Sequence, residues 1–161
     1  MQMDNQNTDF RRDYKLGEVP IRPSRRRLKI LLAEDNEADV WMFCEAFDAL
    51  HIDHDLEIVR NGEEALKRLM SLEPLPEIIL LDVNMPRLDG FAVLKAVRGD
   101  PRLRAIPVIM MSSSRAEADV RRAHELGANS YLYKTLSDFS DLVGDFDRYW
   151  LRRAELPIPQ V

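Results

Sequence analysis

The sequence has one cysteine and no apolar run long enough to cross a membrane. Cys44 stands alone among 161 residues, so no disulfide can form within the chain. The longest apolar runs, such as 78–81 and 108–111, have the length of strands, whereas a membrane helix needs about 20 apolar residues. The first 27 residues are polar and lack the apolar core and cleavage site of a secretory signal. We therefore expect a cytoplasmic protein with no disulfide framework and no membrane contact.

Positive charge is scarce outside the N-terminal segment. The chain holds 28 acidic and 23 basic side chains, for a net charge of −5, but its first 29 residues carry eight Lys or Arg and only four acids. The remainder is therefore acidic, which argues against a core that binds nucleic acid. Pro20, Pro23 and many Asn, Gln and Asp residues predict that 1–27 is a flexible basic extension.

Short apolar runs alternate with helical periodicity from Leu28 onward. The pattern predicts strands at 28–33, 56–59, 77–81, 108–111 and 130–133, and helices at 37–50, 63–71, 91–98, 117–126 and from 137 onward. In the first helix Asn36 is the expected N-cap, and the apolar residues at helical spacing are Trp41, Phe43, Cys44, Phe47 and Leu50. The alternation predicts an α/β domain: a five-stranded parallel sheet with helices on both faces.

Polar residues with useful chemistry follow four of the five predicted strands, in this order: Glu34 and Asp35, then Asp82, Ser112 and Lys134. The carboxyl ends of parallel strands meet at one edge of a sheet, so these groups are expected to converge there. Three close carboxylates repel one another unless a cation neutralises them, and oxygen ligands favour Mg²⁺. A lysine and a hydroxyl beside them would cradle a phosphoryl group.

These residues lie in motifs that resemble the receiver domains of two-component response regulators over residues 28–152. The motifs are Glu-Asp at 34–35, Asp-Val-Asn-Met-Pro-Arg-Leu-Asp-Gly at 82–90, Ile-Pro-Val-Ile-Met-Met-Ser at 106–112 and Tyr-Leu-Tyr-Lys at 131–134. The resemblance implies a flavodoxin-like (βα)5 fold with strand order 2-1-3-4-5, followed by a tail at 153–161.

The resemblance also implies a role for each matching residue. Asp82 would be the phosphoacceptor, with Mg²⁺ bound directly by Asp35 and Asp82, through water by Glu34, and by the backbone carbonyl of Asn84. The phosphoryl-binding and switch residues would be Ser112, Lys134 and Tyr131, and the turn glycine with positive φ would be Gly90. Such a domain catalyses only its own phosphorylation and dephosphorylation, so it is not an enzyme acting on a separate substrate.

Further stretches resemble the small stand-alone regulators that partner phytochrome-type histidine kinases. They are 36–40, 60–66, 112–114, 128–131 and 146–151. The implied partner is therefore a sensor histidine kinase of the bacteriophytochrome type. Two residues depart from the family pattern: Thr135 follows Lys134 where the family usually has a cis-proline, and Ser112 replaces the commoner threonine.

The sequence also admits three other interpretations. A metal-dependent phosphohydrolase would need a second acid two residues after Asp82, where the chain has Asn84. A zinc site formed by the cluster His51, Asp53, His54 and Asp55 would compete with a solvated loop that has a histidine at a helix end. A receiver-like interaction module that signals without phosphorylation remains the alternative function.

Apolar side chains accumulate at the C-terminal end. Tyr149, Trp150 and Leu151 exceed one core-facing stripe, and the segment 156–161 is apolar and cannot bury itself. The alternative interpretation is that Trp150 closes the bottom of the core and that the tail after it is frayed. We predict instead a homodimer through the fourth helix, fifth strand and fifth helix together with the C-terminal extension.

Overall fold

The computed structural model describes residues 27–71, 73–134, 139–151 and 156–157. The strands are β1 (Leu28–Ala33), β2 (His54–Val59), β3 (Ile78–Asp82), β4 (Val108–Ser112) and β5 (Ser130–Tyr133). The helices are α1 (Glu37–Ala49), α2 (Gly62–Leu69), α3 (Gly90–Gly99), α4 (Glu117–Glu125) and α5 (Phe139–Phe146), and a π-helical turn η1 (Asp147–Leu151) continues α5. The predicted N-terminal extension apart from Arg27, residue 72, residues 135–138 (with Thr135) and 152–155, and most of the tail lie outside the described residues.

All five strands are parallel and pair in the order β2-β1-β3-β4-β5. The predicted fold class and strand order are therefore confirmed. Parallel strands leave their carboxyl ends on one edge of the sheet, where Ala33, Asp82 and Ser112 end β1, β3 and β4. This edge carries the candidate site.

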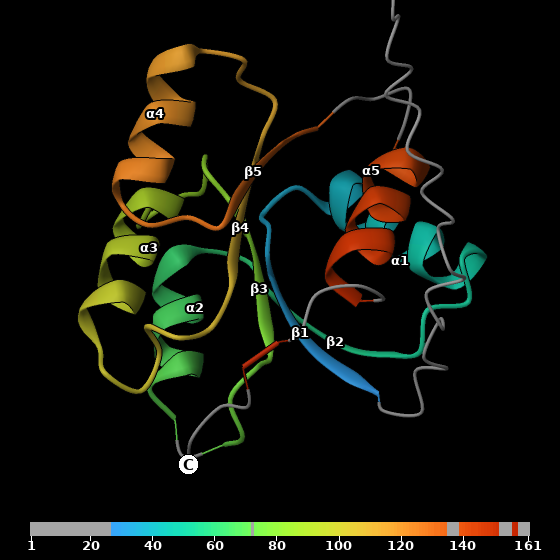
Figure 1. Ribbon diagram of the computed structural model, residues 1–161, viewed down its shortest axis with the longest axis horizontal. Coiled ribbons are helices and arrows are strands. Elements are labelled where there is room, and N and C mark those ends of the chain that lie inside the picture. Colours follow the sequence, from blue (N-terminus) through green and yellow to red (C-terminus); the bar gives the residue numbers. More distant parts are fainter. Residues whose placement is uncertain (1–26, 72, 135–138, 152–155, 158–161) are drawn as a thin grey trace, which may run out of the picture.

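The sheet is buried on both faces because its strands are apolar at successive positions. In β1, Ile30 and Leu32 pack into the core under α1 and α5, while Leu31 and Ala33 pack under α2, α3 and α4. Figure 1 shows these two helical layers on opposite sides of the sheet. No helix of the described part of the chain is long and apolar enough to cross a membrane.

Two local expectations were wrong. Trp41 was expected on the inward stripe of the first helix, but it is 63% exposed, while Val40, Phe43 and Phe47 are buried. Trp41 follows Val40 by one residue, so it lies about 100° around the helix from the buried stripe. The second strand begins at His54, earlier than its apolar pattern indicated, because it is the half-exposed edge strand and pairs with β1 from Leu28 onward.

Candidate functional site

A cleft of roughly 390 Å³ opens at the carboxyl edge of the sheet. Its lining comes from the ends of β1 and β3, the loops after β3, β4 and β5, and the first turns of α1 and α5. The lining residues are Glu34, Asp35, Asn36, Asp39, Asp82, Asn84, Ser113, Lys134 and Phe139. Five of these were predicted as site residues from the sequence. The topology thus brings together groups that lie up to 100 positions apart.

Asp82 is the last residue of the central strand β3 and is 4% exposed. Its carboxylate forms an ion pair with the Lys134 ammonium, at 2.7 Å. Burial and this ion pair hold the Asp82 carboxylate in one position.

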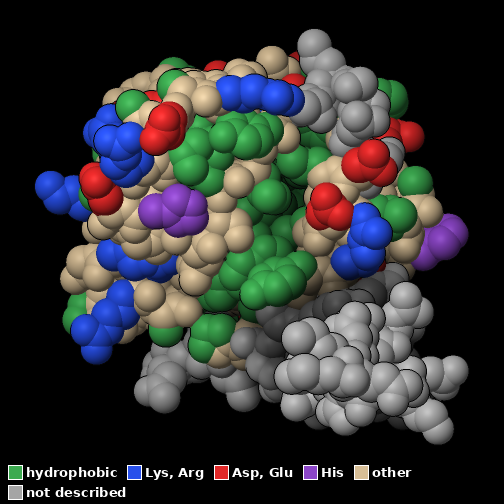
Figure 2. Space-filling model, turned by 45° about the horizontal axis from the view of Figure 1, so that its top comes forward, with side chains coloured by type: hydrophobic (Ala, Val, Ile, Leu, Met, Phe, Trp, Pro, Cys, Tyr) green, Lys and Arg blue, Asp and Glu red, His purple; other side chains and the backbone are tan. Residues whose placement is uncertain are grey.

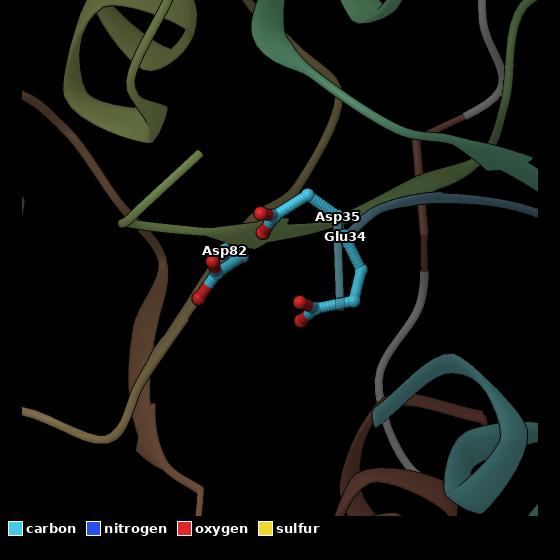
Figure 3. Close-up of side chains that lie close together, drawn as sticks. All are labelled: Glu34, Asp35 and Asp82. Carbon is cyan, nitrogen blue, oxygen red and sulfur yellow. The ribbon is translucent and has the colours of Figure 1, made fainter. Parts of the chain in front are cut away.

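Three carboxylates converge on one point, as Figure 3 shows. Ligand oxygens of Glu34, Asp35 and Asp82 all lie within 4.8 Å of one another. Glu34 is buried and Asp35 is exposed, so this trio opens toward solvent on one side. An oxygen-only donor set with net negative charge fits a hard divalent cation such as Mg²⁺. Asn84 also lines the cleft, and the role of its carbonyl remains a prediction.

Lys134 contacts a third acid that the sequence analysis assigned no role. Its ammonium lies 2.5 Å from Glu34, 2.7 Å from Asp82 and 3.1 Å from Asp39. Asp39 lies in the first turn of α1, where the Asn36 side chain accepts hydrogen bonds from the Ala38 and Asp39 amides as predicted for an N-cap. The sequence feature that could have identified Asp39 is an acidic residue in the first turn of the helix that follows Glu34 and Asp35.

Burial shifts the acid–base properties of the site. It raises the pKa of Glu34, and the nearby Asp82 charge adds to this effect. It also raises the pKa of Asp82, although the hydrogen bond from Lys134 opposes the rise. For Lys134 burial acts to lower the pKa, but its hydrogen bonds with Asp82 and Glu34 outweigh burial and the net pKa rises. The ammonium therefore stays protonated near neutral pH.

Ser112 and Tyr131 lie beside the cleft and are not among its lining residues. Ser112 ends β4 and is fully buried, and its hydroxyl accepts a hydrogen bond from the Ser114 amide at 3.0 Å. The half-buried Tyr131 donates its hydroxyl proton to the Ser114 carbonyl, at 3.3 Å. Ser114 therefore connects the two residues that the resemblance names as the switch.

The structure explains the glycine at position 90 differently from what was expected. Gly90 was predicted to need a positive φ, but Gly127 is the only glycine with one among the described residues. Gly90 instead lies against the end of β3, and its amide donates to the Val83 carbonyl at 2.9 Å. The absence of a Cβ permits this close approach.

The histidine and aspartate cluster after α1 has a structural explanation. His51 has φ 51° and donates its amide to the Asp48 carbonyl, while Ile52 donates to the Phe47 carbonyl. These two bonds end α1 in a Schellman motif with His51 at the left-handed position. Among the described residues, the trio of Glu34, Asp35 and Asp82 is the only group with metal-ligating geometry, so the zinc interpretation lacks support.

The family comparison agrees with this geometry. Residues 30–145 match the model of the response regulator receiver domain. The chain is 40% identical over 137 residues to the probable methanogenesis regulatory protein FilR2 of Methanothrix harundinacea, covering 81% of this chain and 88% of that protein. It is 38% identical over 135 residues to the response regulator Rcp1 of Synechocystis sp., covering 80% and 92%.

Solved structures extend the likeness to three dimensions. The Mn²⁺-bound form of Rcp1 matches with a TM-score of 0.76 at 37% identity, covering 81% of this chain and 99% of that chain. The phosphorylated cyanobacterial phytochrome response regulator RcpA matches with a TM-score of 0.77 at 35% identity, covering 82% and 99%. With its sheet order, its acidic cleft and this matched span, the chain belongs to the response regulator receiver family of two-component signalling.

Proposed function

We propose that this receiver accepts a phosphoryl group on Asp82 from a phosphohistidine of a sensor kinase. The observation that carries the proposal is the placement of Asp82 at the base of an open cleft, 2.7 Å from Lys134 and within 4.8 Å of the acidic pair. A phosphorylatable acid, a fixed cation and two metal-ligating acids are the parts that phosphoryl transfer to an aspartate needs.

In the transfer, a carboxylate oxygen of Asp82 attacks phosphorus. A new P–O bond forms while the P–N bond to the kinase histidine breaks, and the imidazole leaves. Lys134 neutralises charge that builds on the phosphoryl oxygens, because its ammonium stays protonated. The buried position of Asp82 fixes the direction of attack.

We propose Mg²⁺ as the cation of the acidic trio, held by Glu34, Asp35, Asp82 and the carbonyl of Asn84. When bound, it supplies charge neutralisation for the carboxylates and the transferred group. Support comes from the oxygen-only donor set and from the Mn²⁺-bound form of the relative Rcp1.

The output is proposed to be a change in protein contacts. The Ser112 hydroxyl now accepts a hydrogen bond from the Ser114 amide, and on phosphorylation it would move to donate its proton to a phosphoryl oxygen. Tyr131, joined to the same loop through Ser114, would then turn inward. A Ser112→Ala variant should take the phosphoryl group and yet respond less in partner affinity or oligomeric state; an undiminished response would exclude Ser112 as the relay.

Two partners are proposed. The first is a phytochrome-type histidine kinase, supported by the likeness to RcpA and to the bacteriophytochrome response regulator RtBRR, which is 33% identical with a TM-score of 0.67. The second is another copy of this chain, bound through α4, β5 and α5. Figure 2 shows hydrophobic side chains gathered on the side of the molecule that it presents. Tyr133 in β5 is 38% exposed, and Tyr149 in η1, which continues α5, is 59% exposed.

The phosphoacceptor is tested with acetyl phosphate, Mg²⁺ and intact-protein mass. The wild type is expected to gain one phosphoryl group, transferred as a P–O bond to acetate breaks, and Asp82→Asn to gain none. Equal labelling of both would exclude Asp82. An unlabelled wild type would favour the interaction module that signals without phosphorylation.

The dimer is tested by light scattering of the full chain at micromolar concentration, with and without phosphorylation. Tyr149→Asp should weaken self-association. Trp41→Asp is the matched control, because Trp41 is also an exposed aromatic residue, at 63%, and lies on α1, which is not one of the elements of the proposed face. A monomer under every condition would contradict the dimer.

A further inference from the structure

Three carboxylate acceptors surround the Lys134 ammonium, one for each of its N–H groups. An ammonium carries three N–H groups, and three carboxylates lie around this one, from Glu34, Asp82 and Asp39. A phosphoryl oxygen on Asp82 needs one of these donors. One of the present acceptors must therefore release the lysine when the phosphoryl group arrives.

Asp39 is the acceptor that is released most easily. Its contact with the ammonium is the longest of the three, at 3.1 Å, against 2.5 Å for Glu34 and 2.7 Å for Asp82. Its side chain is 17% exposed, whereas those of Glu34 and Asp82 are 1% and 5% exposed. Water can therefore solvate the Asp39 carboxylate after release, which it cannot do as well for the other two.

Asp39 also belongs to a different part of the fold. Glu34 and Asp82 stand at strand ends and are members of the metal-ligating trio, which does not include Asp39. Asp39 comes from the first turn of α1, and its backbone is fixed there by the Asn36 cap. The lysine is thus held between the sheet on one side and α1 on the other.

We propose that Asp39 is a positioning residue for phosphoryl uptake: it holds the Lys134 ammonium between α1 and Asp82 and competes with the incoming phosphoryl group for it. This inference rests on the proposed phosphorylation of Asp82. Asp39 acts through Lys134, because it occupies an ammonium N–H group that a phosphoryl oxygen on Asp82 needs. Its removal therefore favours uptake.

The first experiment measures the second-order rate constant for uptake from acetyl phosphate at a fixed Mg²⁺ concentration, by intact-protein mass. Asp39→Asn is expected to raise this constant roughly three- to tenfold, the effect of one partly exposed charge pair. Asp39→Glu keeps the charge and is expected to stay within about twofold of the wild type. The matched control is Glu37→Gln, since Glu37 is an exposed acid in the same helical turn.

If Asp39 acts through Lys134, the effect of replacing Asp39 must depend on the presence of Lys134. In a Lys134→Met background, Asp39→Asn should leave the uptake rate unchanged, because there is no ammonium left to share. A merely structural role would persist in that background. The proposal is overturned if Asp39→Asn does not raise the rate, if Glu37→Gln raises it equally, or if the effect survives without Lys134.

The second experiment needs no phosphorylation, so it separates this proposal from the proposed function. Urea unfolding of the wild type, the two single variants and the double variant is measured in EDTA. Asp39→Asn is expected to raise the folding equilibrium constant by at least about threefold more in the Lys134→Met background than in the wild-type background. The reason is that Asp39 has lost its cation when Lys134 is replaced. Equal effects in both backgrounds would show that the pair is not coupled and would overturn the proposal even if Asp82 is phosphorylated; coupling without phosphorylation would overturn only the proposed function.

Discussion

Gly90 lies directly against Asp82: a Cβ on Gly90 would stand 2.2 Å from the Asp82 carbonyl oxygen. Two non-bonded atoms cannot share that space, so any other residue at position 90 must move the backbone of β3 or the start of α3. The motif glycine therefore controls the position of Asp82.

We expect Gly90→Ala to destabilise the fold by about 1–3 kcal/mol through this overlap, and to slow phosphoryl uptake on the displaced Asp82. Urea unfolding and the acetyl phosphate assay measure the two effects. Gly99→Ala is the matched control in α3, since a Cβ there meets nothing within 4 Å. The control should be neutral or gain up to about 1 kcal/mol from helix propensity. Equal effects at both positions would contradict the overlap.

Lys134 is the single cation that contacts Glu34, Asp39 and Asp82 among the described ion pairs. Its loss leaves buried carboxylates without a counter-charge, so Lys134→Met is expected to cost about 3–5 kcal/mol of unfolding free energy in EDTA. The exposed Lys95 is the control, and Lys95→Met should stay within about 0.5 kcal/mol of the wild type. Added Mg²⁺ should recover part of the loss, and a neutral Lys134→Met variant in EDTA would refute the electrostatic argument.

Asp82 should give the stability a characteristic pH dependence in the absence of metal. Burial raises its pKa above the ordinary value of 3.8, so the folded protein holds this proton more tightly than the unfolded chain. The stability that this group contributes is therefore fully present below about pH 3.8 and is lost as pH rises through the raised pKa.

The matching measurement is chemical unfolding in EDTA between pH 7 and pH 4, for the wild type and Asp82→Asn. As pH falls, the unfolding free energy of the wild type is expected to rise relative to that of Asp82→Asn, because the variant cannot bind the extra proton. A difference that is constant across this range, or that changes in favour of Asp82→Asn, would contradict the raised pKa.

His51 occupies the same place after α1 that Gly127 occupies after α4. Both helices end in a Schellman motif, with φ 51° at His51 and φ 90° at Gly127. A histidine is strained in the left-handed region, so His51→Gly is expected to raise the unfolding free energy by about 1 kcal/mol, and Gly127→Ala to lower it by a similar amount. Thermal unfolding checks both, and a loss of stability in His51→Gly would mean that the histidine side chain has a role of its own.

The sequence by itself determined the order of strands and helices and most of the chemistry of the cleft. Strand-sized apolar runs that alternate with helical periodicity indicate buried parallel strands, and the topology then brings Glu34, Asp35, Asp82 and Lys134 to one edge. These inferences need only local periodicity and one rule about sheets. The inward placement of Trp41 failed because several registers of an apolar helix look alike until the partner surface is known.

Tertiary structure alone decided which groups touch. The contact of Asp39 with Lys134 joins residues 95 positions apart, and no local pattern encodes which acid of a helical turn faces a distant lysine. The need for glycine at position 90 likewise came from the distance to the Asp82 carbonyl, and the backbone angle of Gly90 did not require it. Packing distances between elements arise from the whole core, so the sequence pattern can name the site residues but cannot rank their contacts.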